Sequence, residues 1–111
     1  MEIQFRDADS VTVAEIAGSV DGLTAGELIG ALGDRVKGGS TRIVADLAAV
    51  EYISSAGLRA LLATMKDARQ RGGDFRLAAV RPDVSRVLDL SGFTSILKIY
   101  PDAAAAVASF S

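Results

Sequence analysis

The sequence predicts an α/β domain in which a mixed β-sheet starts with an antiparallel hairpin and helices pack on the sheet. Residues 2–6 and 11–17 alternate apolar and polar side chains, the pattern of half-buried strands, and turn residues 7–10 separate them. Farther along, short apolar runs alternate with stretches of helical spacing, which predicts parallel strands joined by right-handed crossovers. The 111 residues suit a single domain, 1–111, and half of them are hydrophobic.

The first helix is expected after the turn signal Asp21-Gly22. Thr24 is predicted to be its N-cap, with Glu27 three residues later completing a capping box. Gly38-Gly39 ends the helix. Its apolar residues fall on one helical face: Ala25, Leu28, Ile29, Leu32 and Val36.

A buried central strand is predicted over Thr41–Leu47, where the apolar run is short and rich in β-branched residues. A second helix follows from about Ser55 to Arg71, and Gly72-Gly73 stops it. Its apolar residues recur at helical spacing: Leu58, Leu61, Leu62 and Met65.

The rest of the chain repeats this alternation. A strand is expected over Phe75–Val80, and Arg81-Pro82 then opens a short helix that Ser91-Gly92 ends. Ser95–Tyr100 is predicted to be the last strand. Pro101-Asp102 starts an alanine-rich helix whose apolar side would carry Ala103, Ala106, Val107 and Phe110. The predicted order is β-β-α-β-α-β-α-β-α.

Composition excludes several functions. The chain has a net charge of −2 with acids and bases interspersed, so no clustered basic face predicts nucleic-acid binding. It contains no Cys and no His, so we expect no disulfide, no Ser-His-Asp triad and no His metal ligand. Lys37–Thr41 lacks the order of a P-loop. We therefore expect no cofactor and no catalytic residue, and any chemistry on this chain to be performed by a partner.

Location is predicted from the start of the chain and from its apolar runs. The first residues do not have the basic-then-apolar pattern of a signal peptide. No uninterrupted apolar run approaches the roughly 20 residues of a membrane helix. We expect a cytoplasmic protein without membrane insertion.

Two adjacent serines are the main candidates for a site. Ser54 and Ser55 lie where a strand ends and the second helix begins, and the free N–H groups of a helix start favour negative charge. Ser55 could be only an N-cap, or it could carry a phosphate. Gly57 would let a backbone or a phosphate approach closely, and Arg59, one turn into the helix, could pair with phosphate or remain a solvated charge.

Three stretches carry a resemblance to a known family: Gly18–Ala25, Ile53–Leu58 and Val87–Phe93. They resemble, in order and rough spacing, motifs of the STAS family of bacterial anti-sigma-factor antagonists. The resemblance implies that Ser55 occupies the phosphorylated position. Ser54 replaces the Asp that usually precedes it, and this departure leaves two alternatives: phosphorylation of Ser54 instead, or no phosphorylation.

The resemblance also implies a function. The unphosphorylated protein would bind an anti-sigma factor that is a serine kinase of the histidine-kinase-like ATPase type, and would thereby release the kinase's target. The kinase would use ATP and Mg²⁺ to phosphorylate Ser55, and a serine phosphatase would reset it. The expected partner-binding residues are Asp21, Ser54, Ser55, Gly57 and Arg59.

The sequence leaves two alternative functions open. Because Ser54 replaces the usual Asp, the chain could instead be a constitutive adaptor or scaffold in a transporter or other signalling complex. An enzyme or nucleotide-binding domain is the second rival, and the absence of His, Cys and a phosphate-loop motif argues against it.

Overall fold

The computed structural model describes residues 1–111 and contains one five-stranded sheet in which the spatial order follows the chain, β1-β2-β3-β4-β5. The strands are β1 (Glu2–Ala8), β2 (Val11–Val20), β3 (Arg42–Ile53), β4 (Asp74–Ala78) and β5 (Ile99–Tyr100). β1 and β2 pair antiparallel, whereas β2, β3, β4 and β5 pair parallel. The predicted mixed sheet with an N-terminal hairpin is confirmed.

The hairpin turns tightly at Asp9 and Ser10, which both have positive φ (51° and 65°). Two successive residues with positive φ are typical of a type I′ turn, whose twist matches that of the flanking strands. Ala8 is therefore directly opposite Val11, and the strands pair without interruption back to Glu2.

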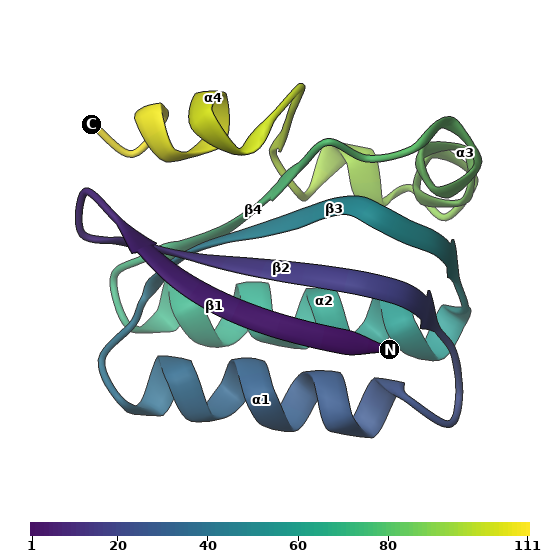
Figure 1. Cartoon of the computed structure of the whole chain (residues 1–111), viewed down its shortest axis with the longest axis horizontal. Helices are drawn as coiled ribbons and strands as arrows, with labels where there is room; N and C mark the ends of the chain where they lie inside the picture. Colours follow the sequence, from purple (N-terminus) through teal and green to yellow (C-terminus); the bar gives the residue numbers. More distant parts are fainter.

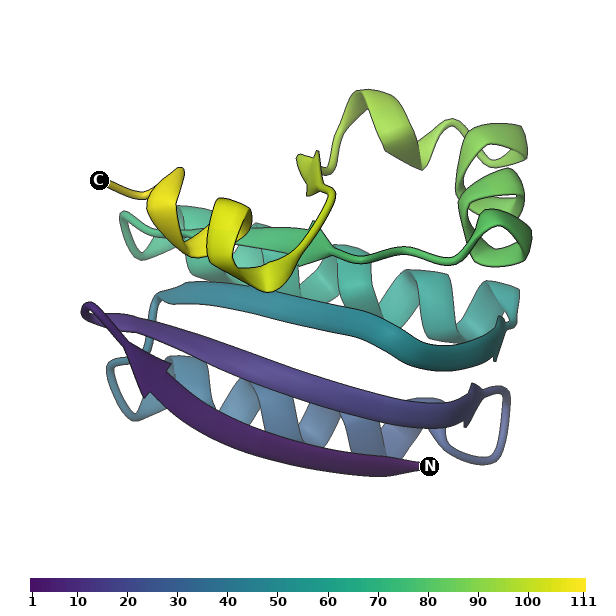
Figure 2. The ribbon, with the colours of Figure 1, turned by 45° about the horizontal axis from the view of Figure 1, so that its top comes forward.

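The helices form two unequal layers. α1 (Ala25–Lys37) and α2 (Ser55–Gln70) cover one face of the sheet, and α4 (Ala103–Ala108) lies on the other (Figures 1 and 2). α3 (Pro82–Leu90) and the short 3₁₀ helix η1 (Phe93–Ser95) lie beyond the β4 side of the sheet (Figure 2), and they pack against the larger core. A core of 21 buried residues includes the side chains between the sheet, α1 and α2, whereas a separate cluster of six holds α4.

A charged cluster ties the C-terminal half together. The carboxylate of Asp74 accepts hydrogen bonds from Arg69 (2.7 Å) and Arg76 (3.0 Å), and Lys98 lies 3.9 Å away. Arg76 also donates to Ser109 Oγ at 2.7 Å. Burial opposes ionisation of Asp74, but the hydrogen bonds from Arg69 and Arg76 outweigh it and hold the pKa of Asp74 below its ordinary value.

Several sequence predictions of element bounds are wrong. β3 continues to Ile53, past the predicted end at Leu47, and it stays paired with β2 through two register shifts. The predicted strand Ser95–Tyr100 is reduced to its last two residues, since the chain turns at Gly92 (φ 76°) and forms η1 first. Ile29 was expected on the buried face of α1, but its side chain is 41% exposed.

The lengthened β2 and β3 end side by side and set the position of the site. Val20 pairs with Ile53 in the last step of their register. α2 begins two residues after β3, and α1 begins after the short loop that follows β2, both on the right in Figure 1. Asp21 and Ser54 are therefore brought to one end of the sheet.

No helix is both long enough and apolar enough to cross a membrane.

Candidate functional site

The start of α2 is anchored on the last residue of β2. The N–H of Ser54 donates to the carbonyl oxygen of Val20 at 2.8 Å. Ser54 has extended backbone angles, and its side-chain oxygen accepts the N–H of Gly57 at 3.2 Å. Ser54 is therefore the N-cap of α2. The interpretation of Ser55 as the cap is wrong, because the helix begins one residue earlier than that role requires.

Ser55 is the first residue of α2, and its side chain is exposed to solvent. Its hydroxyl makes no hydrogen bond within the chain, in contrast to the hydroxyl of Ser54. The N–H groups of Ser55 and Ala56 have no partner inside the helix, because the first turn of any helix lacks them. The site therefore combines a free hydroxyl with free donors at the positive end of a helix dipole.

Gly57 is required by close packing. A Cβ at this position would lie 2.8 Å from Cγ1 of Ile53, 2.8 Å from Cγ1 of Val20 and 3.0 Å from the Val20 carbonyl oxygen. These distances are shorter than side-chain contacts allow, so the glycine lets α2 rest directly on the ends of β2 and β3. The close approach that it permits is to the protein's own backbone, and Gly57 itself is buried.

Arg59 is exposed on α2, four residues after Ser55. Residues four apart lie on the same helix face, so Arg59 lies about one helical turn from Ser55. Arg59 forms no ion pair within the chain, in contrast to Arg69 and Arg71, which lie near the other end of α2. Its charge is available to a ligand near Ser55.

Asp21 closes the loop between β2 and α1. Its Oδ1 accepts the N–H groups of Leu23 (2.9 Å) and Thr24 (3.1 Å), and its own carbonyl oxygen accepts the N–H of Ala25 at 2.9 Å. The hydrogen bonds from Leu23 and Thr24 hold the pKa of Asp21 below its ordinary value. Asp21 is therefore ionised at neutral pH.

Thr24 occupies the predicted N-cap position of α1, but the predicted capping box with Glu27 is wrong. Its backbone is helical (φ −103°, ψ −16°), and its side chain makes no capping hydrogen bond. Its hydroxyl instead accepts the N–H of Asp21 at 2.9 Å and lies 3.1 Å from the carbonyl oxygen of Ser19, to which it can donate. Thr24 folds the loop back onto β2, and Asp21 supplies the acceptor at the helix start.

The fold is shared with known proteins. Residues 2–106 match the family described as STAS domain. The chain belongs to the STAS domain family. The match covers all five strands and the first three helices, so the similarity to the family extends well beyond the two serines.

Named relatives of this STAS domain are anti-sigma factor antagonists. BtrV of Bordetella bronchiseptica, which carries that name provisionally, is 36% identical over 110 residues, or 99% of this chain and 95% of BtrV. The anti-sigma-F factor antagonist RsfB of Mycobacterium tuberculosis is 33% identical over 98 residues, or 88% of this chain and 80% of RsfB. The crystal structure of an anti-sigma factor antagonist from Mycobacterium paratuberculosis superposes with a TM-score of 0.88 at 31% identity, covering 97% of this chain and 92% of that one.

Two apolar side chains at this end of the STAS domain were missed in the sequence. Leu23, in the loop after β2, is 94% exposed, and Tyr52, two residues before Ser54, is 54% exposed. The sequence signal for Leu23 was its position between two turn residues, outside any periodic stretch. Tyr52 lay beyond the predicted end of its strand. Large exposed apolar side chains beside charged ones are typical of protein-binding surfaces.

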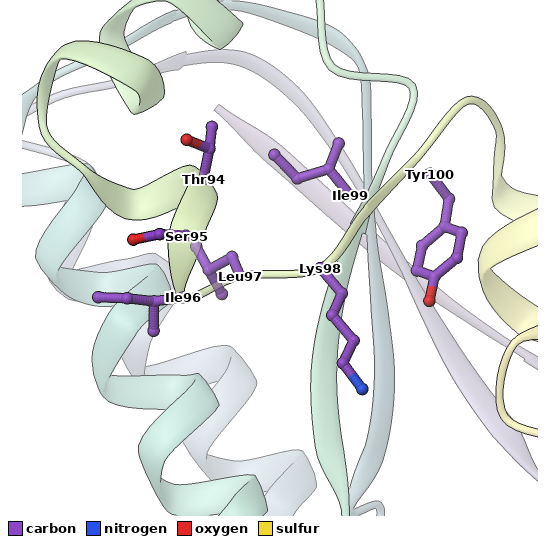
Figure 3. Close-up of a pocket in the computed structure, with 7 residues that line it drawn as sticks. All are labelled: Thr94, Ser95, Ile96, Leu97, Lys98, Ile99 and Tyr100. Atoms are coloured by element: carbon purple, nitrogen blue, oxygen red, sulfur yellow. The ribbon is translucent and has the colours of Figure 1, made fainter.

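A separate hollow lies along the β5 edge of the sheet. It is open, has a volume of about 520 Å³ and is lined by the consecutive residues Thr94–Tyr100 (Figure 3). None of these residues belongs to the loops that follow β2 and β3, so the hollow is not part of the serine site. No cluster of three or more Asp, Glu, His or Cys side chains is arranged to hold a metal ion.

Proposed function

We propose that this STAS domain is a phosphorylation-switched anti-sigma-factor antagonist. Its unphosphorylated form binds an anti-sigma factor, which is a serine kinase of the histidine-kinase-like ATPase type, and thereby releases the kinase's target. The names of its relatives support the antagonist function. The observation that carries the switch is the free, exposed hydroxyl of Ser55 at the first residue of α2.

Ser55 is the favoured acceptor because the neighbouring hydroxyl is already in use. Ser54 is half-buried, and its oxygen accepts the N–H of Gly57, so a phosphate on Ser54 would disturb the cap of α2. A phosphate on Ser55 would require no loss of a hydrogen bond within the chain. Ser54 remains the alternative acceptor to be tested.

The chain is substrate and ligand in this proposal, and the partner is the catalyst. The Ser55 hydroxyl attacks the γ-phosphorus of ATP, the bond to the β-phosphate oxygen breaks, and ADP leaves with its Mg²⁺. The hydroxyl proton passes to a base of the kinase, because the chain has no His and no side chain bonded to Ser55. A serine phosphatase hydrolyses the ester and restores the binding form.

The phosphate acts on the interface and leaves the fold intact. It adds about −1.5 to −2 charges at a helix N-terminus, where the dipole tolerates negative charge. Arg59, one turn away, is placed to pair with it. The partner surface that binds the neutral hydroxyl would have to bury an unmatched charge after phosphorylation. A loss of about 2–3 kcal/mol of binding free energy would weaken binding roughly 30-fold to 150-fold.

The rest of the interface is proposed from exposure around the serine. Asp21 supplies a fixed negative charge, and Leu23 and Tyr52 supply apolar contact area. Gly57 contributes indirectly, since it is buried and holds α2 in place.

The acceptor is tested by phosphorylation with the kinase that the wild-type protein captures from native lysate. Wild type, Ser55→Ala and Ser54→Asp are incubated with ATP and Mg²⁺, and phosphosites are mapped by mass spectrometry. Ser54→Asp is the matched control, because Asp caps a helix as well as Ser but has no hydroxyl. We expect label on wild type and Ser54→Asp only. If phosphate is still incorporated into Ser55→Ala but not into Ser54→Asp, the phosphorylation site is Ser54.

The switch is tested by binding. Ser55→Asp should stay folded in thermal melting yet bind the captured kinase at least roughly tenfold more weakly than wild type. If wild type and Ser55→Asp bind the same partners equally and no phosphate is ever found, the chain is a constitutive adaptor and the proposed switch fails.

A further inference from the structure

The two edges of the sheet differ in how well they are protected. β5 has only two residues, Ile99–Tyr100, and Pro101 follows it, so this edge offers little backbone to another strand. β1 (Glu2–Ala8) forms the other edge over seven residues, contains no Pro and no Lys, and pairs with β2 without a bulge. It runs along the margin of the molecule in Figure 2. β1 is therefore an open edge.

The hairpin determines which backbone groups of β1 are free. In a hairpin with a two-residue turn, the residues that flank the turn, here Ala8 and Val11, form a hydrogen-bonded pair. Because the pattern alternates, the even-numbered residues of β1 direct their N–H and C=O groups toward β2. Ile3, Phe5 and Asp7 direct theirs outward, where no strand of this chain receives them.

The side chains of β1 divide into an apolar and a charged row. Ile3 and Phe5 pack against the larger core but remain partly exposed at the edge. Glu2, Gln4 and Arg6 lie exposed on the opposite face. Arg6 has only a loose partner within the chain, Glu15 at 3.9 Å, and both side chains are 47% exposed. Within the chain, the Phe5 ring also carries the guanidinium of Arg35, 4.3 Å from its centre.

The order of these residues is self-complementary in one antiparallel register. With a two-fold axis at Gln4, Glu2 of one copy lies opposite Arg6 of the second, and Ile3 lies opposite Phe5. An axis at Ile3 would place Glu2 opposite Gln4, and an axis at Phe5 would place Ile3 opposite Asp7. Of these three registers, only the one centred on Gln4 matches opposite charges on one face and apolar side chains on the other.

We propose that β1 pairs with β1 of a second copy of this chain, antiparallel and centred on Gln4, which joins the two sheets into one. The outward N–H and C=O groups of Ile3 and Phe5 form the central hydrogen bonds between the copies. Closed two-fold symmetry stops the assembly at a dimer on this edge. The proposal does not depend on phosphorylation of Ser55.

The expected association is weak and dependent on concentration. One strand pair covers less area than the roughly 1,600 Å² of a standard interface. Sedimentation velocity of the wild-type chain from about 10 µM to about 1 mM should therefore show a monomer shifting to a dimer. A wild type that stays monomeric over this range would overturn the proposal.

Charge reversal tests the register. Glu2→Arg and Arg6→Glu each place like charges opposite one another twice in the dimer, so each should weaken dimerisation roughly tenfold to a hundredfold. Glu51→Arg, a reversal at an exposed position of β3, is the matched control and should dimerise like wild type. Far-UV circular dichroism checks that every variant is folded.

Mixing the two single variants gives the decisive result. One chain then carries arginine at both positions of β1 and the other carries glutamate at both, so every facing pair in the mixed dimer has opposite charges. The mixture should recover wild-type affinity as a heterodimer, detected by native mass spectrometry. The double variant Glu2→Arg/Arg6→Glu should recover it as a homodimer. Single variants that dimerise like wild type, or a mixture that stays monomeric, would show that this register of β1 is not the interface.

Discussion

The first two helices start at neighbouring points on one end of the sheet, yet their starts are closed by different groups. At α1, the carboxylate of Asp21 accepts two N–H groups, and the hydroxyl of Thr24 is bonded into the loop. At α2, the hydroxyl of Ser54 caps the helix alone, and the hydroxyl of Ser55 is left without a partner. The hydroxyl that the cap of α2 does not use is therefore the one left free for the proposed phosphorylation.

The two starts also differ in how closely they rest on the strands. Gly57 of α2 has no room for a side chain, because Val20 and Ile53 lie against it. Gly26 and Gly30 of α1 would carry a Cβ without meeting any atom within 4 Å. Glycine is a packing requirement at the first site and only a backbone choice at the others.

The largest expected effect follows from this packing. Gly57→Ala should destabilise the domain by about 1–3 kcal/mol, because the methyl group must displace the ends of β2 and β3. Chemical denaturation of wild type and variant measures the change. A loss below about 0.5 kcal/mol would mean that the start of α2 can lift without penalty, and would contradict its role in fixing Ser55.

The second prediction separates the two serines. Ser54→Ala should cost about 1 kcal/mol, since it removes the acceptor of the Gly57 N–H. Ser55→Ala should stay within about 0.5 kcal/mol of wild type, because the Ser55 hydroxyl bonds nothing within the chain. Both values come from the same denaturant titration. Equal losses would show that the hydroxyls share the capping role.

The third prediction uses pH to distinguish the caps. The pKa of Asp21 is lowered by the hydrogen bonds from Leu23 and Thr24, so its stabilising contribution is complete above its ordinary pKa of 3.8 and is lost as pH falls through the lower folded value. The amide chemical shifts of Leu23 and Thr24 should titrate in this acidic range. The shift of Gly57, bonded to a serine, should show no transition of its own.

Asp21→Asn is the control for this titration, because the amide oxygen can still accept hydrogen bonds but carries no charge. In this variant the acid transition of the Leu23 and Thr24 amides should disappear. A transition that persists would have to arise elsewhere, and Asp21 would not be the group that titrates.

The smallest expected effect is a gain in stability. Gly26→Ala should stabilise the domain by about 0.4–1 kcal/mol, because alanine restricts the unfolded chain and fits the exposed face of α1. Thermal and chemical denaturation would both report it. A destabilised Gly26→Ala would indicate that the surface of α1 needs its glycines for something other than packing within the monomer.

The sequence was sufficient for the fold and for locating the serine pair, but not for the local geometry of the site. Strand periodicity and helical spacing identified the elements, since burial imposes those patterns directly. Which of Asp21 and Thr24 would close α1 depended on the path of the loop from Ser19, which no local pattern encodes. The same limit applied to Ser54 and Ser55, because a shift of one residue in the helix start exchanges their roles. Leu23 and Tyr52 gave no periodic signal, and only their exposure revealed them.

The six-residue helix α4 has a consequence for the dynamics of the whole chain. A helix this short is not stable in isolation, so α4 remains folded only while it is docked. Its attachments are the small cluster around Val107, the bond from Arg76 to Ser109 and the guanidinium of Arg76 4.0 Å from the centre of the Phe110 ring. Amide hydrogen exchange should therefore find a subglobal opening in which α4 detaches as one unit, well before the strands exchange. The stability of this domain should therefore be graded, lowest at its C-terminus and highest in the layer that holds Ser55.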